Sequence, residues 1–434
     1  MTPDDNATLR LQGIYNTLCH AITRPDRKFA VTRYFLDEWV PLLGPSLAWL
    51  IVALRQRCFW NDRRDWCVVD QATLARETAL KPRSIERNLQ KPYADWFVLE
   101  VTRRYRYRRS MGKKVRDRNR YHLLLTEPLS PRHQVGLETL LQQRLAGISP
   151  AASPVETALH LAQSLLDDPD LTTHLAKAPP PPENPSPRTI WQLLEGALSV
   201  SLTDYADRNH LARLDEACAR LHNHIVQPNK VYVGWQYFRL KWVPLLGHAL
   251  AWLVVFLRRN CYWDEKTGIL RDECVFYKKD LAAAIGQTTR NLNHLFQNPY
   301  APLFFTCLTD EEEAAASPGG RTPRSRNQPL CYRVRMVDDP LTPEDQEQVN
   351  RDIEKYLRQS IPGEDPETGQ QNFLPLISPP PNRQNFAYPE VSEKLSDRKA
   401  KKCRLDAEAS EKLSDRSKRG IGKIVGATKE SLKK

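Results

Sequence analysis

The stretch WVPLLGPSLAWLIVALRQRCFWND, residues 39–62, decides how this chain is interpreted, because WVPLLGHALAWLVVFLRRNCYWDE follows at residues 242–265. A segment so apolar first suggests a membrane span. The run Pro41–Leu54 is, however, closed by arginines, and it is shorter than the roughly 20 residues that a bilayer core requires. The sequence therefore predicts no membrane segment but a buried helix, Leu42–Arg57, that occurs twice in one chain.

The repetition extends well beyond this helix. Upstream matches recur at one constant spacing: Leu11, Leu18, Pro25, Tyr34 and Phe35 return as Leu214, Leu221, Pro228, Tyr237 and Phe238. Downstream, CVVDQATLARETALKPRSIERNLQKPY (67–93) matches CVFYKKDLAAAIGQTTRNLNHLFQNPY (274–300), and PLSP at Pro128 matches PLTP at Pro340. An internal duplication explains all of these matches. We call residues 11–131 the first repeat and residues 214–343 the second repeat.

These matches divide the chain into four segments. Residues 1–135 and 211–347 are expected to be folded domains, each with an N-terminal helix. Residues 136–210 are a helical and proline-rich linker, and residues 348–434 are a short helix followed by a disordered basic and polar tail. Because Pro179–Pro187 is typical of a semi-rigid spacer, the two repeats need not touch.

Composition limits the functions to consider. A formal net charge of +12 favours a polyanionic partner. Nine cysteines, none in a C-x-x-C pair, indicate neither a disulfide framework nor a zinc site. The N-terminus lacks the pattern of a secretory signal, so we expect a cytoplasmic protein, associated with the nucleoid or a plasmid. We found no phosphate-binding loop and no catalytic constellation, and we therefore expect no enzyme, cofactor or metal.

Two short helices are expected after the buried helix of each repeat. In the first repeat they are Gln71–Glu77 and a helix that begins near Lys81, with Pro82 in its first turn. In the second repeat Asp280–Ile285 is the first helix, Gly286 supplies the turn and Thr288 is the N-cap of the next.

A β-hairpin is expected to follow the helices. In the first repeat SMGKK joins DWFVLEVTRRYRYRR to DRNRYHLLLTE, and in the second a loop at residues 311–328 joins PLFFTCLTD to PLCYRVRMV.

Three helices followed by a hairpin resemble the winged helix-turn-helix superfamily. The segments that carry the resemblance are QATLARETALKPRSIERNLQ and KKDLAAAIGQTTRNLNHLFQ. The expected fold is therefore mainly α with small β-hairpin wings, an α+β class, built as tandem winged-helix domains. The resemblance implies that the third helix enters a DNA major groove while the wing lies on the flanking backbone or minor groove.

The outward face of the third helix supplies the candidate base readers. In the first repeat these are Arg83, Ser84, Arg87 and Gln90. In the second repeat they are Arg290, Asn291, Asn293 and His294. Arginine can bind guanine with two hydrogen bonds, and asparagine can bind adenine in the same way. A merely solvated helix face is the alternative for both sets.

The first wing carries the most basic stretch of the chain, RRYRYRRSMGKKVRDRNR at residues 103–120. Its candidate phosphate contacts are Arg103, Arg104, Arg106, Arg108, Arg109, Lys113, Lys114, Arg116 and Arg118. Strand alternation places the residues at 104, 106 and 108 on one face and those at 103, 105, 107 and 109 on the other. The second wing begins with acidic DEEE, and its basic residues Arg321, Arg324 and Arg326 lie in the loop. Its contact with DNA stays open.

Together these features predict a double-stranded DNA-binding protein with two winged helices in one chain. The architecture is similar to that of plasmid replication initiators, which implies an origin or iteron binder of a plasmid or mobile element. A transcription regulator or nucleoid-type factor on the same fold stays open, as does a winged-helix module that binds protein or RNA. A homodimer, and host replication or transcription proteins bound through the C-terminal tail, are further partners left open.

Overall fold

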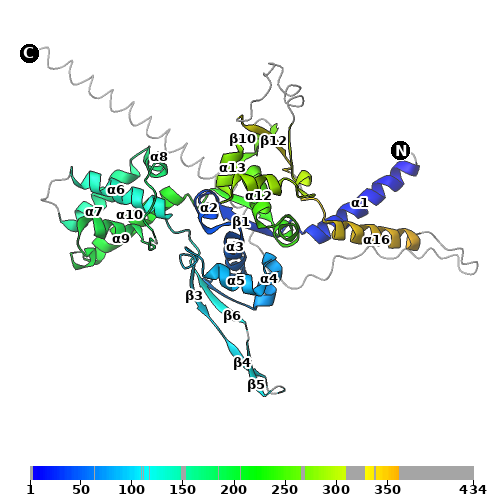
Figure 1. Ribbon diagram of the computed structural model, residues 1–434, viewed down its shortest axis with the longest axis horizontal. Coiled ribbons are helices and arrows are strands. Elements are labelled where there is room, and N and C mark those ends of the chain that lie inside the picture. Colours follow the sequence, from blue (N-terminus) through cyan, green and yellow to red (C-terminus); the bar gives the residue numbers. More distant parts are fainter. Residues whose placement is uncertain are drawn as a thin grey trace, which may run out of the picture. The chain divides into compact units, whose positions relative to one another are not determined.

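The computed structural model describes residues 3–360 except 63, 109, 111, 117, 148–152, 184, 206, 265–268, 309–327 and 337–338 (Figure 1). This part of the chain is mainly helical with a few small antiparallel sheets, which is an α+β class. It belongs to one compact unit. Among the described residues no helix is long and apolar enough to cross a membrane.

The first repeat contains the following helices and strands: α1 (Pro3–Thr23), β1 (Lys28–Thr32), the π-helical turn η1 (Phe35–Trp39), α2 (Val40–Leu43), α3 (Pro45–Trp60), β2 (Trp66–Val69), α4 (Gln71–Thr78), α5 (Pro82–Leu89), β3 (Val98–Thr102), β4 (Tyr105–Arg108), β5 (Lys113–Arg116) and β6 (Asn119–Leu123). The single helix expected at Leu42–Arg57 is wrong at its start. Gly44, with a φ of 72°, separates α2 from α3, and this left-handed conformation is one that glycine adopts without steric cost.

The second repeat repeats this order of elements: α10 (Arg208–Val226), β7 (Val231–Trp235), η4 (Phe238–Trp242), α11 (Val243–Leu246), α12 (His248–Asn260), β8 (Tyr262–Asp264), β9 (Ile269–Arg271), β10 (Glu273–Phe276), α13 (Lys278–Ala284), α14 (Thr289–Leu295), η5 (Ala301–Leu303), β11 (Phe305–Cys307) and β12 (Leu330–Val334). The small hairpin β8–β9 is an addition that the sequence did not predict. The helix α16 (Pro343–Ser360) follows.

Between the repeats the chain forms α6 (Pro131–Leu145), α7 (Pro154–Leu166), α8 (Leu171–Ala176), α9 (Ile190–Leu198) and the short turn η3 (Leu202–Asp204). Helix α10 packs against α7 and α9, and its Leu214 and Leu221 are fully buried. The equivalent residues of α1, Leu11 and Leu18, are only half-buried, because α1 packs mainly against α16. The residues expected to form a linker thus bury one face of the second repeat.

Each repeat contains a three-stranded sheet of the same topology. The strand order is β2-β6-β3 in the first repeat and β10-β12-β11 in the second, and all neighbours are antiparallel. Two helices, α4 and α5 or α13 and α14, lie in sequence between the first strand and the other two. Equivalent residues pair in both sheets, as Cys67 with Tyr121 and Cys274 with Tyr332.

The two repeats also pair with each other, through strands β1 and β7. Ala30 lies opposite Val233 at the centre, Lys28 opposite Trp235 and Thr32 opposite Val231. In the duplication Lys28 corresponds to Val231 and Thr32 to Trp235, so equivalent residues exchange places across this pair. That exchange is the mark of a two-fold, isologous interface.

Helices α3 and α12 also contact each other, at the two-fold axis that relates β1 to β7. The rings of Trp49 and Trp252, which are equivalent residues, stack at 4.2 Å with an interplanar angle of 22°. Trp49 donates its indole N–H to the carbonyl of His248 (3.2 Å), and Trp252 donates to the carbonyl of Pro45 (3.0 Å). The expectation that the repeats need not touch is therefore wrong. Because Leu47–Leu54 is buried without interruption, α3 needs apolar neighbours on more sides than one domain supplies.

The arginines that close the opening stretch are structural. Arg55 binds Glu127 (2.7 Å) and the carbonyl of Leu124, with its guanidinium over the rings of Phe35 and Phe97. The second repeat contains the equivalent contacts. Arg258 binds Asp339 (2.7 Å) and the carbonyl of Arg335, and its guanidinium lies over the rings of Phe238 and Phe304. These arginines link α3 and α12, by hydrogen bonds and ion pairs, to the segment after the last strand of the sheet in the same repeat.

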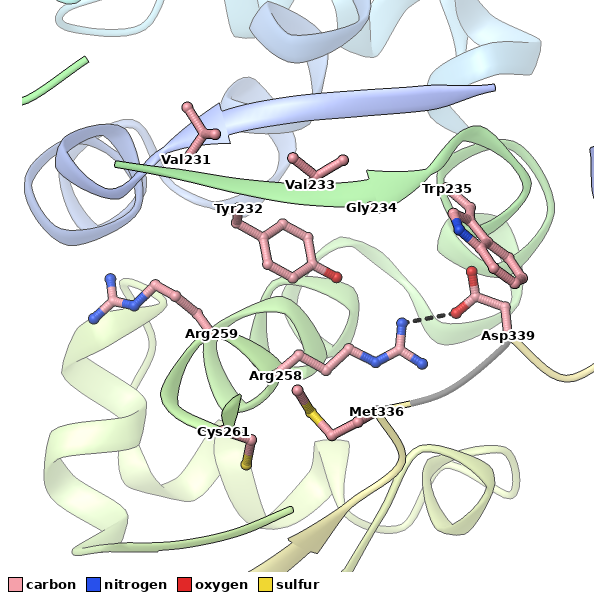
Figure 2. A pocket seen from close by; sticks show the side chains of 10 residues that line it. All are labelled: Val231, Tyr232, Val233, Gly234, Trp235, Arg258, Arg259, Cys261, Met336 and Asp339. Carbon is pink, nitrogen blue, oxygen red and sulfur yellow. Dashed lines mark hydrogen bonds and ion pairs between the residues drawn. The ribbon is translucent and has the colours of Figure 1, made fainter. Parts of the chain in front are cut away.

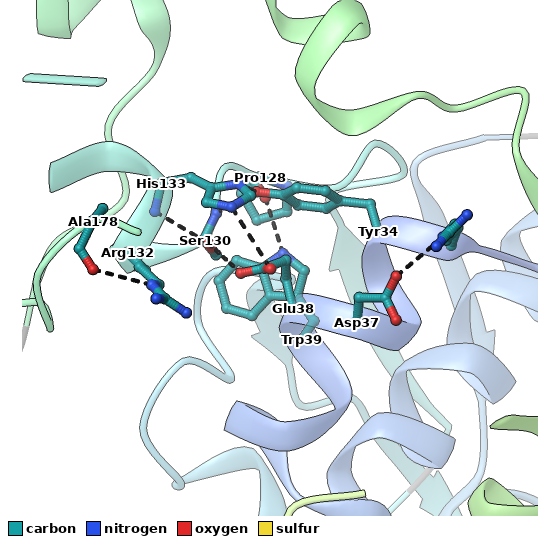
Figure 3. Close-up of polar contacts among 10 residues, drawn as sticks. Tyr34, Asp37, Glu38, Trp39, Pro128, Ser130, Arg132, His133 and Ala178 are labelled. Carbon is teal, nitrogen blue, oxygen red and sulfur yellow. Dashed lines mark hydrogen bonds and ion pairs between the residues drawn. The ribbon is translucent and has the colours of Figure 1, made fainter. Parts of the chain in front are cut away.

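A second polar cluster occurs in both repeats with different residue types, and Figure 3 shows the cluster of the first repeat. In the first repeat the Tyr34 hydroxyl accepts from the backbone N–H of Ser130 and bonds the ring of His133 (2.9 Å), which lies 3.6 Å from Glu38. At the equivalent positions of the second repeat, an ion pair joins Lys241 to Asp345 at 2.9 Å. The geometry is kept while the acidic and basic partners exchange positions.

Candidate nucleic-acid interface

In the first repeat the pair α4 and α5 is fixed by caps and by a small apolar core. Asp70 caps α4 by accepting from the backbone N–H of Thr73 (2.6 Å), and this bond holds the pKa of Asp70 below its usual value. Leu74 of α4 and Ile85 of α5 are fully buried. Leu74 and Ile85 therefore lie on the inward side of the pair, and α5 presents its other side to solvent.

The candidate base readers of α5 lie on that outer side. Arg83, Arg87 and Gln90 are exposed. Ser84 is half-buried, and its backbone carbonyl accepts from the side chain of Asn88 (2.9 Å). Three of the four candidates are thus free to reach a ligand, and the fourth lies at the margin of the surface.

Two further basic residues of this helix pair are exposed, and the sequence reasoning missed both. Arg76 in the last turn of α4 and Lys81 at the N-cap of α5 are exposed. Arg118, at the base of the wing, lies close enough to lower the pKa of Asp70, after the larger effect of the hydrogen bonds from Thr73. Arg76 follows the buried Leu74 by two positions, which on a helix places it on the opposite side. That spacing was the available signal.

The corresponding surface of the second repeat is exposed but less basic. Thr288 caps α14 as predicted, accepting from the backbone N–H of Asn291 (3.2 Å). All four candidates, Arg290, Asn291, Asn293 and His294, are exposed. Two of them are already engaged, because Asn291 donates to Gln287 and Asn293 accepts from Lys278, each at 3.2 Å.

The turn before α14 lies against the first repeat. Gly286 has a φ of 62°, and a Cβ at this position would approach the carbonyl oxygen of Pro41 to 2.7 Å. A side chain here would be strained and would also clash with backbone. The position of α14 relative to the first repeat is therefore fixed by a close contact between the repeats.

The first wing continues its sheet as a narrow two-stranded ribbon, β4 with β5, which projects beyond β3 and β6 (Figure 1). The sequence predicted one unbroken strand with alternating faces from residue 103, and this is wrong at its start. Arg103 and Arg104 lie between β3 and β4 and outside both ladders, where they are exposed. Two residues without ladder pairing separate the ribbon from the sheet on this side.

Within the ribbon the register opposes Tyr105 to Arg116, Arg106 to Val115, Tyr107 to Lys114 and Arg108 to Lys113. Tyr105 and Tyr107 are 60% and 58% exposed, and Arg118 is also exposed. Arg109 lies outside the described residues, as do Arg321, Arg324 and Arg326 of the second wing. Five of the candidate phosphate contacts therefore lie in the ribbon: Arg106, Arg108, Lys113, Lys114 and Arg116.

A pocket of about 370 Å³ lies elsewhere, between β7 and the end of α12 (Figure 2). Both of its arginines are engaged, Arg258 with Asp339 and Arg259 with Asp37 of the first repeat. Among the residues that the structure describes, no group of three or more His, Cys, Asp or Glu side chains could hold a metal ion. The lining of the pocket includes the structural ion pair of Arg258 with Asp339 and no residue of α5 or α14.

Comparisons with models of protein families, with curated proteins and with solved structures found no match to this chain.

Proposed function

We propose that this chain binds double-stranded DNA through two winged helices that are joined as an intramolecular dimer. The observation that carries the proposal is the topology found twice: helix, strand, two helices and two strands, with the first strand beside the last. This is the order of a winged helix-turn-helix, in which the second of the paired helices enters the major groove. By this proposal α5 and α14 are the recognition helices.

The distribution of charge supports unequal roles for the two heads. The helix pair of the first repeat exposes Arg83 and Arg87 together with Arg76 and Lys81, whereas two of the α14 candidates form hydrogen bonds within the protein. Phosphate contacts supply most of the affinity of such proteins, and base contacts supply their specificity. The first repeat is therefore the main anchor, and the second repeat reads a weaker half-site.

The two-fold relation between the repeats bears on the target. A protein with two-fold symmetry binds half-sites that are inverted relative to each other. We infer an imperfect inverted repeat as the target. The cellular role that we propose is that of a replication-initiator-like protein of a plasmid or mobile element, and a regulator of transcription would use the same contacts at a promoter.

The test measures binding of the full chain to random duplex DNA across salt, together with sequencing of the genomic fragments that it retains. Each neutralised phosphate should contribute about −0.9 to the log–log slope. Arg83→Ala with Arg87→Ala should relax sequence preference, by about 1–3 kcal/mol for each lost base contact. The matched control is Arg213→Ala with Arg220→Ala, which removes the same charge from the exposed side of α10.

A slope near zero for the unaltered chain would contradict the proposal. So would equal losses in the α5 variant and the α10 control, because general charge rather than the recognition face would then decide binding. Bound fragments that cluster near an A·T-rich origin support initiation, whereas fragments at promoters support transcription control.

A further inference from the structure

We propose that the ribbon formed by β4 and β5 is a binding site for single-stranded DNA, on which Tyr105 and Tyr107 stack against unpaired bases. The inference deepens the DNA binding proposed above by assigning a second form of the ligand to the wing. It rests on three observations: where the two tyrosine rings lie, what the register places opposite them, and what the helix-turn-helix lacks.

The two tyrosines contribute nothing to a protein core. Tyr105 and Tyr107 are 60% and 58% exposed, whereas Tyr34 and Tyr121 of the same repeat are buried. They occupy alternate positions of β4, so they share one side of the ribbon. A two-stranded ribbon has no second layer to cover such rings. Their planar faces are therefore available to a ligand.

The register places a basic residue opposite each tyrosine. Tyr105 lies opposite Arg116, and Tyr107 lies opposite Lys114. Residues directly opposite in an antiparallel pair share a face and have their Cβ atoms about 5 Å apart. Aromatic and basic positions therefore alternate along one side of the ribbon. Proteins that bind single strands combine these same two elements, aromatic platforms for the bases and cations for the backbone.

The aromatic residues decide between a single strand and a duplex. In duplex DNA the faces of the bases are already covered by their neighbours, so an exposed ring would have to separate a base step before it could stack. A ribbon that served only duplex phosphates would need its cations alone. No aromatic residue occurs in α4 or α5, whose long exposed side chains are the arginines Arg76, Arg83 and Arg87. The two surfaces thus divide the ligand, with α5 on the duplex and the ribbon on an unpaired strand.

The experiment uses the full chain and fluorescence anisotropy of two labelled probes, an oligothymidylate and a random duplex, each of about 30 units. Tyr105→Ala with Tyr107→Ala should weaken oligothymidylate binding about 30-fold or more, the effect expected of two modest stacking contacts. The matched control, Tyr105→Phe with Tyr107→Phe, keeps both rings and removes only the hydroxyls. It should stay within about twofold of the unaltered chain. Duplex binding and the unfolding temperature should not change in either variant.

Three outcomes would overturn the inference: equal weakening with Phe and with Ala, which would assign the effect to the hydroxyls; equal losses on both probes; or tighter binding of oligouridylate than of oligothymidylate, which would make the ligand RNA. Failure of the proposed duplex binding is a separate result. In that case the unaltered chain would ignore the duplex while the tyrosine variants still lost the single strand. Failure of the present inference leaves the duplex slope and the α5 variants as expected.

Discussion

The two repeats share several interior hydrogen bonds and ion pairs, and they differ more on their surfaces. Trp39 donates its indole N–H to the carbonyl of Pro128, and the equivalent Trp242 donates to the carbonyl of Pro340. The exposed residues differ in character. The first repeat exposes arginines on α5, whereas the second repeat exposes Val275 of β10 and Tyr277, which follows that strand. Burial has preserved the scaffold, while the exposed faces have been free to take different ligands.

The difference is most informative where the scaffold itself is polar. Glu38 with His133 and Lys241 with Asp345 occupy equivalent places with the acidic and basic residue types exchanged, and burial lowers the pKa of His133. Each pair joins a repeat to the first turn of the helix that follows it, so its two partners could change together without disturbing the other repeat. The comparison teaches that position and complementarity are retained, whereas the sign of the charge is not.

The largest effect on stability is expected from a substitution at the two-fold axis, where the two repeats contact each other. Trp252→Ala removes the stack on Trp49 and the hydrogen bond to the carbonyl of Pro45. We expect a loss of about 3–5 kcal/mol in the free energy of unfolding, measured with denaturant. Trp60→Ala is the control, because Trp60 is 41% exposed. An unchanged midpoint for Trp252→Ala would show that the repeats fold independently of this contact.

A smaller change in the free energy of unfolding is expected at Arg239, a buried residue of the second repeat whose equivalent in the first repeat is the buried Leu36. Arg239, 1% exposed, donates through Nε to Gln236, and among the described residues its Nη1 and Nη2 have no hydrogen-bond partner. Burial lowers the pKa of Arg239 to about 10. Arg239→Leu, which installs the first repeat's residue Leu36, should stabilise the chain by about 1–2 kcal/mol.

The reverse exchange is the matched variant. Leu36→Arg should destabilise the chain by about 3 kcal/mol, because it buries a cation without a prepared partner. Thermal and denaturant unfolding measure both changes. Destabilisation by Arg239→Leu would show that the guanidinium makes a favourable contact that its geometry does not suggest.

The smallest expected effect is a dependence on pH at the contacts between repeats. Burial lowers the pKa of His222 and of His248, which bond the carbonyls of Glu127 (3.0 Å) and Thr78 (2.5 Å) in the first repeat. Because the folded pKa lies below the unfolded value near 6.5, the unfolded chain binds more protons between the two. Stability is therefore fully present above about pH 6.5 and falls as the pH is lowered towards the folded pKa.

Unfolding by denaturant at pH 7.5 and at pH 5.5 measures this loss, about 1 kcal/mol or less for each histidine. His222→Gln should reduce the pH dependence while keeping a side-chain donor near the carbonyl of Glu127. A pH dependence unaltered by this substitution would assign the effect to other groups.

Much of the local structure could be predicted from the sequence, because it depends on patterns within one repeat. The buried helix, the cap at Thr288, the turn at Gly286 and the exposed face of α5 follow from periodicity and local chemistry. The contact between repeats could not, since matched segments show that two units are alike but not which faces meet. The apolar character of α3 on all sides was the available indication of this contact. The helix break at Gly44 and the strand break at Arg103 were also not predicted, because each depends on the conformation of one or two residues.

The pairing of β1 with β7 has a consequence for how the protein would respond to its own abundance. Two-headed DNA-binding proteins assembled from separate subunits must first associate, so their occupancy rises steeply with concentration and collapses on dilution. Here the partner strand is encoded downstream in the same gene, and Ala30 meets Val233 at any dilution. Under the proposed function, the occupancy of a DNA site by one chain should therefore rise with the first power of protein concentration. In a cell that makes few copies, such a protein would still arrive with both heads in place.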